Sequence, residues 1–553
     1  MGAGIMSAID WIILVITLTG IIVYGIYKSR TTKNLDGYFL SNRCMPWYIV
    51  LLSIMGTQAS AITFLSAPGQ AYSDGMRFVQ YYFGLPLAMI VICVVFVPVF
   101  RSLKVYTAYE FLEERFDLKT RTFTSFLFQV SRGLSTGISI YAPSLILSSL
   151  LEWNIYRTNI IMGGLLIIYT MIGGAKAVAY TQKLQLVIII AGMVVAGYML
   201  VHLLPAGIGF TDALNLGGKS GKINVITTGI SNNGFDWKDK YNIWSGVIGG
   251  FFLALSYFGT DQSQVGRYLT AKGNRESKIG LLMNGLVKVP MQFLILLIGV
   301  LVFSFYQYNK APIYFNDVQA AQAKQTGYKD SLVYLENQYA LLNVKSDATE
   351  ITAIKAQYKN VLKMALPKNE DVNDANYIFL RFVIDYLPKG IIGLLIAVIF
   401  LAAWGSIAAA LNALASCTVV DIHKKFIHKE LTPKMDYRIS QMYTLFWGIF
   451  CIAVAQFASN LGNSLIETVN ILGSLFYGVI LGIFLIAFWL KKIHGNATFY
   501  GALLAEVLVI LIYKWDKVSF LWLNVIGAVL VIIIAMVLQL VLPANPPKQK
   551  RLL

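Results

Sequence analysis

The sequence predicts an all-α polytopic membrane protein of about thirteen transmembrane helices, and three observations support this fold class. Hydrophobic residues make up 57% of the chain and charged residues only 13%, whereas soluble domains carry roughly 25% charged residues. Apolar runs of about 20 residues recur, each long enough to cross a bilayer core of about 30 Å. Connections rich in Lys and Arg alternate with connections that carry few. The expected spans are residues 9–27, 46–66, 77–101, 121–150, 157–175, 183–204, 241–262, 279–307, 389–420, 438–459, 463–489, 496–514 and 519–541.

The distribution of basic residues predicts the orientation. The formal net charge of +17 would by itself suit a nucleic-acid partner. Lys and Arg gather instead in alternate loops, such as 101–119, 267–278 and 424–434, which is typical of cytoplasmic loops in membrane proteins. We therefore expect an external N-terminus and a cytoplasmic C-terminus in a plasma membrane, or in the inner membrane of a Gram-negative bacterium. Basic residues follow the first apolar run, so this run is expected to be a retained helix rather than a signal peptide.

The sequence holds no pattern typical of an enzyme. The cysteines at 44, 93, 417 and 451 have neither metal-ligand spacing nor paired positions in outside loops. No histidine–carboxylate cluster and no nucleophile–base combination is found. We expect no catalysis, no disulfide and no nucleic-acid partner, and the expected partners are a small solute and the lipid bilayer.

Two apolar runs are interrupted by polar residues: "SIMGTQASAITFLSAPGQAYSDG" at 53–75 and "LALSYFGTDQSQVGRYLT" at 253–270. Backbone groups without helical partners inside a membrane cost several kcal/mol each unless they face protein or a cavity. Each interrupted run opens a group of five spans, and the two groups begin in opposite orientations. Paired interrupted helices of this kind are typical of inverted-repeat transporters with a site near the bilayer midplane.

This pattern predicts the organisation of the whole chain. We expect a first peripheral helix with a cytoplasmic loop (1–45), a first inverted repeat (46–204), an external loop (205–240), a second inverted repeat (241–489) that includes an external helical loop (308–388), two peripheral helices (490–541) and a cytoplasmic tail (542–553).

Small and charged residues within the spans leave alternatives open. Ala402, Gly405, Ser406 and Ala409 share one face of the ninth span, where small residues permit close helix packing and Ser406 could also offer an oxygen to a cation. Arg132, Asp261 and Lys288 lie inside other spans, where buried charges normally pair or face a cavity. A pair of Asp261 with either cation would be structural, whereas a charge that lines a cavity would be functional.

Several motifs resemble the sodium:solute symporter family. They are "GISIYAPSLILSSLLEW", "IIYTMIGGAKAVAYTQKLQ", "GTDQSQVGRYLTAKG" and "SIAAALNALASCTVVDI". The stretch "LSIMGTQASAITFLSAPGQAY" is most similar to the branch with the sodium/iodide, sodium/monocarboxylate and sodium/multivitamin symporters. The resemblance covers about residues 38–490 and implies a five-plus-five inverted-repeat core of the leucine-transporter type.

The resemblance also implies a sodium site. Backbone carbonyls would come from Gly56, Ala59 and Ala402, and side-chain hydroxyls from the positions of Gly405 and Ser406. Gly405 has no hydroxyl, so Ser406 alone remains. A second sodium site found in some members needs an acid where this chain has Gln182 and serines where it has alanines at 408 and 409. We therefore expect at most one sodium per cycle.

The substrate pocket implied by the resemblance comprises Thr57, Gln58, Ser60, Thr63, Tyr81, Tyr82, Asp261, Gln262, Lys288 and Asn470. Two polar residues that hexose-carrying members use are replaced by Thr63 and Tyr82, which argues against a hexose. The expected function is sodium-coupled import of a small hydrophilic solute, a small organic anion, by alternating access. The alternatives are a sodium-coupled sugar or polyol symporter, and a proton-coupled transporter or uniporter on the same scaffold. A channel or a transport-derived sensor is a rival of another class.

Overall fold

The structure is a computed structural model that describes residues 6–29, 35–151, 153–232, 234–343, 347–367, 372–427, 432–458 and 465–542. The expected cytoplasmic tail lies outside these residues except for Leu542. The first half of the chain folds into α1 (Ala8–Ser29), α2 (Leu35–Leu40), η1 (Ser41–Arg43), α3 (Trp47–Gln58), α4 (Ala61–Asp74), η2 (Met76–Tyr82), α5 (Leu85–Val91), η3 (Ile92–Phe96), α6 (Val97–Ser102), α7 (Glu110–Arg115), α8 (Leu118–Leu151), α9 (Ile155–His202), α10 (Phe210–Lys219), β1 (Ile230–Ser231) and β2 (Gly234–Phe235).

The named elements in the described residues of the second half of the chain are all helices. They are η4 (Ser245–Gly249), α11 (Gly250–Thr260), α12 (Gln262–Leu269), α13 (Asn274–Tyr308), α14 (Asp317–Ala323), α15 (Lys329–Leu341), α16 (Ala348–Ala365), α17 (Ala375–Tyr386), α18 (Ile391–Cys417), η5 (Thr418–His423), α19 (Lys424–Phe426), α20 (Pro433–Ala455), α21 (Leu465–Trp489), α22 (Gly495–Lys514) and α23 (Phe520–Val541).

The number of helices that could cross a membrane is close to the expectation. Ten helices of the described chain are long and apolar enough, and the bent pair α3 and α4 makes an eleventh. Two shorter apolar helices, Ile155–Met171 and Ser245–Thr260, lie where the fifth and seventh spans were expected. The first is short because Gly174, with a φ of 56°, bends α9. The second ends where Asp261 leaves the helical conformation.

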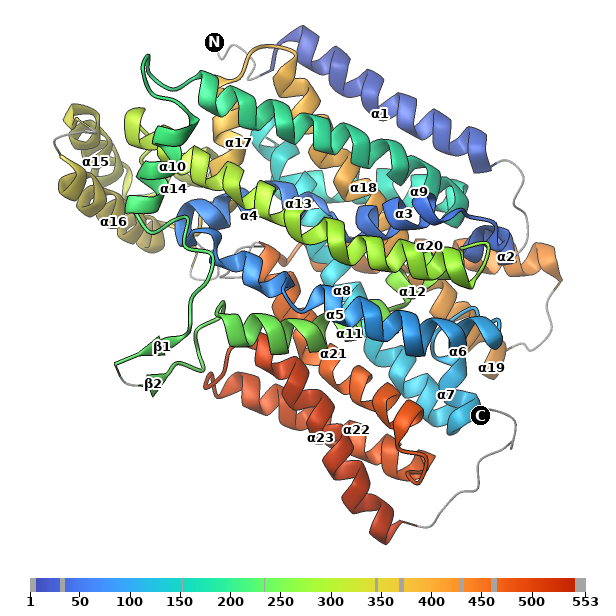
Figure 1. Ribbon diagram of the computed structural model, residues 1–553. Coiled ribbons are helices and arrows are strands. Elements are labelled where there is room, and N and C mark those ends of the chain that lie inside the picture. The colour runs from blue at the N-terminus through green and yellow to red at the C-terminus, as the bar shows by residue number, and fades with distance from the viewer. Residues whose placement is uncertain are drawn as a thin grey trace.

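Helix α18 forms the centre of the bundle. Residues 395–417 are all buried, as expected for a helix that is apolar on every side. It packs against α1, α3, α4, α8, α9, α12 and α20. Helices α1 and α9 lie along one edge of the molecule and α22 and α23 along the opposite edge (Figure 1). The peripheral helices at both ends of the sequence therefore cover a core built from the middle of the chain.

Both interrupted runs are broken helices. Ala59, with φ −82° and ψ 80°, separates α3 from α4, and the two helix axes differ by 58°. Asp261, with φ −77° and ψ 118°, separates α11 from α12, and its carboxylate caps α12 by accepting from Ser263 N at 2.8 Å. Polar residues in an otherwise apolar run thus mark the places where the helical hydrogen-bond ladder stops.

The described residues of the segment 308–388 contain the helices α14 to α17. Helices α14 to α16 have an apolar cluster of their own, with Leu332, Tyr358 and Leu362 at its centre. They project from one end of the bundle, while α6, α7 and α19 lie at the other (Figure 1).

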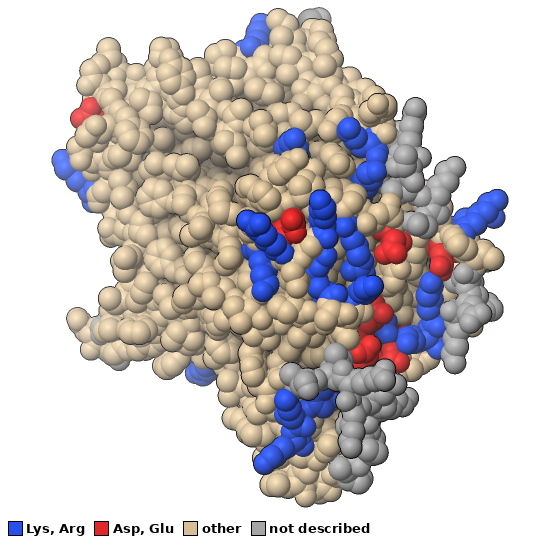
Figure 2. All heavy atoms as spheres, turned by 45° about the vertical axis from the view of Figure 1, so that its right-hand side comes forward, with Lys and Arg blue, Asp and Glu red and all other residues tan. Residues whose placement is uncertain are grey.

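Basic side chains concentrate at the end that carries α6, α7 and α19. When this end is turned forward, most visible Lys and Arg side chains gather in one region (Figure 2). Arg121 there binds Asp421 at 2.6 Å and Glu113 at 2.6 Å, and Lys425 binds Glu113 at 2.9 Å. Burial alone would raise the pKa of the Glu113 carboxyl, but Lys425 and Arg121 hold that pKa below its usual range. These bonds connect α7 and α8 with η5 and α19.

Candidate ion and solute site

A cavity of about 120 Å³ lies where the two broken helices meet α8, α18 and α21. A water molecule occupies about 30 Å³ in the liquid, so the cavity has room for a few waters or a small solute. The residues that line it are Thr57, Gln58, Ser60, Ile62, Thr63, Tyr81, Tyr82, Arg132, Thr136, Ser139, Leu253, Tyr257, Ser263, Ser406, Ile407, Ala410, Ile466, Val469, Asn470, Gly473 and Tyr477.

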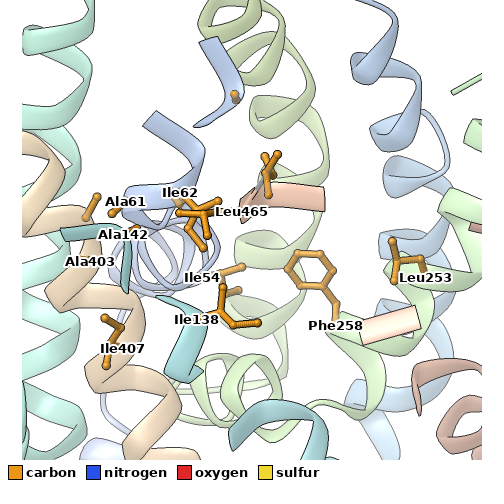
Figure 3. Close-up of a cluster of buried hydrophobic side chains, with 14 of the residues drawn as sticks. Ile54, Ala61, Ile62, Ile138, Ala142, Leu253, Phe258, Ala403, Ile407 and Leu465 are labelled. Atoms are coloured by element: carbon orange, nitrogen blue, oxygen red, sulfur yellow. The ribbon is translucent and has the colours of Figure 1, made fainter. Parts of the chain in front are cut away.

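Polar and apolar side chains divide the cavity wall. Figure 3 shows Ile62, Leu253 and Ile407 within one cluster of buried apolar side chains, and all three also line the cavity. They come from α4, α11 and α18. Hydroxyl and amide groups of α3, α4, η2 and α8 complete the wall. A ligand would therefore be oriented by a few polar groups against an apolar surface, as is usual for small-molecule sites.

Seven of the ten expected substrate residues line the cavity: Thr57, Gln58, Ser60, Thr63, Tyr81, Tyr82 and Asn470. Tyr81 donates from its hydroxyl to Asn470 Oδ1 at 3.1 Å, which links η2 to α21 across one side of the cavity. These residues come from segments far apart in the sequence, and the fold brings them together.

The other three expected substrate residues lie behind the wall. Gln262 holds the loop before α7: its amide donates to Tyr106 O at 2.7 Å and accepts from Ala108 N at 3.0 Å. Lys288 is fully buried on α13, and its ammonium lies 5.6 Å from the Tyr82 ring centroid with no hydrogen-bond partner among the described residues. Tyr82 is thus the cavity-lining neighbour of Lys288.

Asp261 is paired with Arg132 and not with Lys288. Its carboxylate forms an ion pair with Arg132 and accepts from the Tyr477 hydroxyl at 2.9 Å. Asp261 does not line the cavity, whereas Arg132 and Tyr477 do. The Arg132 guanidinium also lies 5.3 Å from the centroid of the Tyr257 ring.

Arg132 is the charged cavity residue that the expected pocket omitted. It is the only charged side chain among the lining residues that the structure describes. Arg132, Thr136 and Ser139 are spaced by four and three residues, so they lie on one face of α8. This polar stripe within the apolar fourth span was a usable signal in the sequence.

The five expected sodium residues lie at the contact between the first broken helix and α18. Gly56 is in the last turn of α3, Ala59 is in the break, and the other three are on α18. Ser406 lines the cavity, and its hydroxyl donates to Ala402 O at 3.0 Å and Ala403 O at 3.1 Å. Its oxygen lone pairs remain for a further donor or a cation.

Gln182 of α9 fills the space between Gly56 and Gly405. Its amide nitrogen donates to Gly405 O at 2.9 Å and Thr57 Oγ1 at 3.1 Å, and its oxygen accepts from Ser53 Oγ at 2.7 Å. A Cβ at Gly56 would lie 2.9 Å from the Gln182 Cβ. The glutamine is fully buried, so an uncharged amide stands where the resemblance implies an acid for a second sodium site.

A Cβ at Gly405 would lie 2.6 Å from Gln185 Oε1. The glycine therefore makes room for a second glutamine of α9. A serine at this position would have to displace the end of the Gln185 side chain.

A sequence model of one transporter family matches residues 38–339 and 354–505, which is most of the chain. The chain belongs to the sodium:solute symporter family. This match confirms the resemblance that its motifs suggest, and it identifies a multi-pass membrane protein of a transporter family.

The curated relatives include acid and anion symporters. The chain is 24% identical to the sodium/sialic acid symporter of Aliivibrio fischeri over 97% of this chain and 93% of that protein. It is 25% identical to the sodium/sialic acid symporter of Proteus mirabilis, over 95% and 93%, respectively. It is also 25% identical to the human sodium/iodide cotransporter, over 88% of this chain and 66% of that protein.

The fold also matches a solved structure. A substrate-bound, outward-open structure of a Na⁺-coupled sialic acid symporter superposes with a TM-score of 0.78 at 23% identity. The match covers 98% of this chain and 99% of that chain. The helical architecture described above is therefore the architecture of that transporter.

Proposed function

We propose that this protein is a sodium-coupled secondary active symporter that imports a small hydrophilic organic anion by alternating access. The observation that carries the proposal is the Arg132 guanidinium in a small polar cavity at the meeting point of two broken helices. Arginine presents several N–H donors in a rigid fork that suits a carboxylate. The names of the curated relatives, which specify sialic acid, iodide and monocarboxylates, agree with an anionic cargo.

A single sodium ion is the proposed driving ion. Its ligands would be the carbonyls of Gly56, Ala59 and Ala402 and the hydroxyl of Ser406, with water in place of the hydroxyl that Gly405 lacks. Sodium prefers oxygen ligands, as hard cations do. The side chain of Gln182 is neutral, and its amide nitrogen donates a hydrogen bond to Gly405 O, which argues against a second sodium ion.

The proposed architecture is a five-plus-five inverted repeat within thirteen spans. Residues 46–204 and 241–489 form the two repeats, and each begins with one of the broken helices. The shorter helices Ile155–Met171 and Ser245–Thr260 would be the two spans beyond the eleven of full length. Solute and ion would bind at the midplane, between the repeats.

The proposed orientation has the N-terminus outside and the C-terminus in the cytoplasm. The concentration of Lys and Arg at the end with α6, α7 and α19 supports a cytoplasmic position of that end (Figure 2). The loop 205–240 and the helices α14 to α16 would then be external.

The test is a ligand screen followed by uptake. Purified protein is heated with small carboxylic acids, each matched with its neutral amide, in sodium or choline buffer. A ligand at about 100 times its Kd should stabilise the fold by about 2.7 kcal/mol. We expect stabilisation by at least one acid but not by its amide, and accumulation of that acid in proteoliposomes only under an inward sodium gradient.

The matched variant removes both charges of the buried pair at once. Arg132→Gln with Asp261→Asn leaves no orphaned charge in the membrane, so the fold should survive while the acid loses its stabilising effect. Equal stabilisation by acids and amides, or undiminished uptake in choline buffer, would contradict the proposed function.

A further inference from the structure

The single cationic group in the cavity wall is already neutralised by the protein. Arg132 donates from Nη2 to Asp261 Oδ2 and to the Tyr477 hydroxyl, the latter at 2.8 Å. The Arg132 side chain is 12% exposed and the Asp261 side chain 0%. A solute in the cavity can therefore reach the guanidinium but not the carboxylate.

Asp261 lies at the break of the second broken helix. Its Oδ1 accepts from Ser263 N at 2.8 Å and from Ser263 Oγ at 2.6 Å, which caps the start of α12. Arg132 belongs to α8, so the ion pair ties the start of α12 to a helix of the other group of spans. Breaking the pair would release one contact between α8 and α12.

A solute carboxylate cannot simply be added to this pair. Asp261 already compensates the charge of Arg132, and a second carboxylate at the guanidinium would be repelled by Asp261 at close range in a site of low dielectric. The solute and Asp261 therefore compete for Arg132. Asp261 can withdraw without losing all partners, because Ser263 N, Ser263 Oγ and the Tyr477 hydroxyl continue to donate to it.

We propose that Asp261 is a resident counter-ion that the carboxylate of the solute displaces from Arg132, and that this exchange frees α12 from α8. Asp261 is thus a positioning residue: it acts through Arg132 and the helix break, and it links recognition of the cargo to movement of the second broken helix. The inference rests on the proposed function, since it takes the solute to be an anion that binds Arg132.

The direction in which Asp261→Asn changes solute affinity distinguishes the counter-ion role from a structural one. Asp261→Asn removes the competitor and leaves Arg132 without an anion, so the solute should bind at least ten-fold more tightly. Transport should fall at least ten-fold, because solute binding no longer changes the contact between α8 and α12. Asp261→Glu keeps the charge and should restore transport in part.

The matched control is Asp421→Asn, which disrupts another buried arginine pair, with Arg121, away from the cavity. It should lower thermal stability without tightening solute binding. Binding is measured by calorimetry in sodium buffer with the acid found in the screen, and uptake is measured in proteoliposomes.

A second readout uses the wild-type protein alone. Hydrogen exchange of residues 262–269 should rise when the acid is added, and it should not change with the neutral amide.

The outcomes separate the two proposals. If the wild-type protein binds no acid, the proposed function fails. The wild-type protein could bind the acid while Asp261→Asn weakens or preserves the affinity, or while hydrogen exchange in residues 262–269 does not rise. Either result would make Asp261 a structural partner only and would overturn the proposed displacement of this counter-ion.

Discussion

Ser406 is the side chain on which the proposed sodium site depends most. Its hydroxyl already donates to Ala402 O, so its lone pairs are directed away from the helix backbone and are available to a cation. Gly405 beside it has no side-chain oxygen, and the end of the Gln185 side chain lies where a side chain at position 405 would begin. Ser406 is the only one of the five expected sodium residues that has a side-chain hydroxyl.

Ser406→Ala should therefore raise the half-saturating sodium concentration by roughly ten- to a hundred-fold. Loss of one polar contact to a charge costs about 1.5–3 kcal/mol, and each 1.4 kcal/mol is a factor of ten. The measurement is solute uptake against sodium concentration at equal protein density. Ser416→Ala is the control, because this buried serine of the same helix donates to Ala413 O at 2.8 Å but does not line the cavity. Equal sodium curves for both variants would make Ser406 a packing residue.

The sequence supports prediction of individual site residues only in part. Thr57, Ser60 and Thr63 could be predicted because hydroxyls inside an apolar run need a polar partner. The placement of Gln262 could not, because its hydrogen bonds reach a loop about 150 residues away in the chain. The sequence indicates that Arg132 is a buried charge, but whether Asp261 pairs with Arg132 or with Lys288 depends on how α8 packs against the break at Asp261.

At the scale of helices, one side chain joins three elements. Gln182 of α9 connects Ser53 and Thr57 of α3 with Gly405 of α18. Its amide nitrogen donates to Thr57 and Gly405, and its amide oxygen accepts from Ser53. A carboxylate of the same shape has no donor and cannot make the first two bonds. The connection at the proposed ion site therefore needs no charge at position 182.

Gln182→Glu should make the stability of the protein depend on sodium. Without a cation, the carboxylate meets Gly405 O with no donor between them, and a buried unsatisfied polar group costs about 1–3 kcal/mol. A sodium ion between the new carboxylate and the Gly405 carbonyl oxygen would restore the contact. We expect the melting temperature of the variant to lie below that of the wild type in choline chloride and to rise more steeply with sodium chloride. Identical sodium-dependent shifts for both proteins would contradict this description of the contact.

Both helix breaks could be predicted because polar residues interrupt apolar runs at Thr57–Ser60 and at Asp261. The lengths of the flanking helices could not. A bend such as that at Gly174 depends on the close approach of Tyr38, whose Cδ2 would lie 2.9 Å from a Cβ at that glycine. Such a contact between distant segments leaves no periodic signal in the sequence.

For the whole molecule, the fold class could be predicted from the length of the apolar runs alone, since the bilayer imposes this length. The position of the cavity could be predicted only through the paired breaks, which are typical of an inverted repeat. The size of the cavity, about 120 Å³, depends on side chains from α8, α18 and α21 that pack around those breaks. It follows that the transport mode is easier to predict than the cargo.

The central claim is that one sodium ion drives the import of one organic anion, and charge movement tests it most directly. One sodium ion with one monovalent anion carries no net charge, whereas each uncompensated charge gains about 2.3 kcal/mol per 100 mV of membrane potential. The measurement is initial sodium-driven uptake of a monovalent acid into proteoliposomes, with a valinomycin-imposed potassium potential of either sign. The account predicts the same uptake rate at both potentials and a sodium Hill coefficient near one. Uptake that is accelerated by an inside-negative potential, or that continues without sodium, would contradict it.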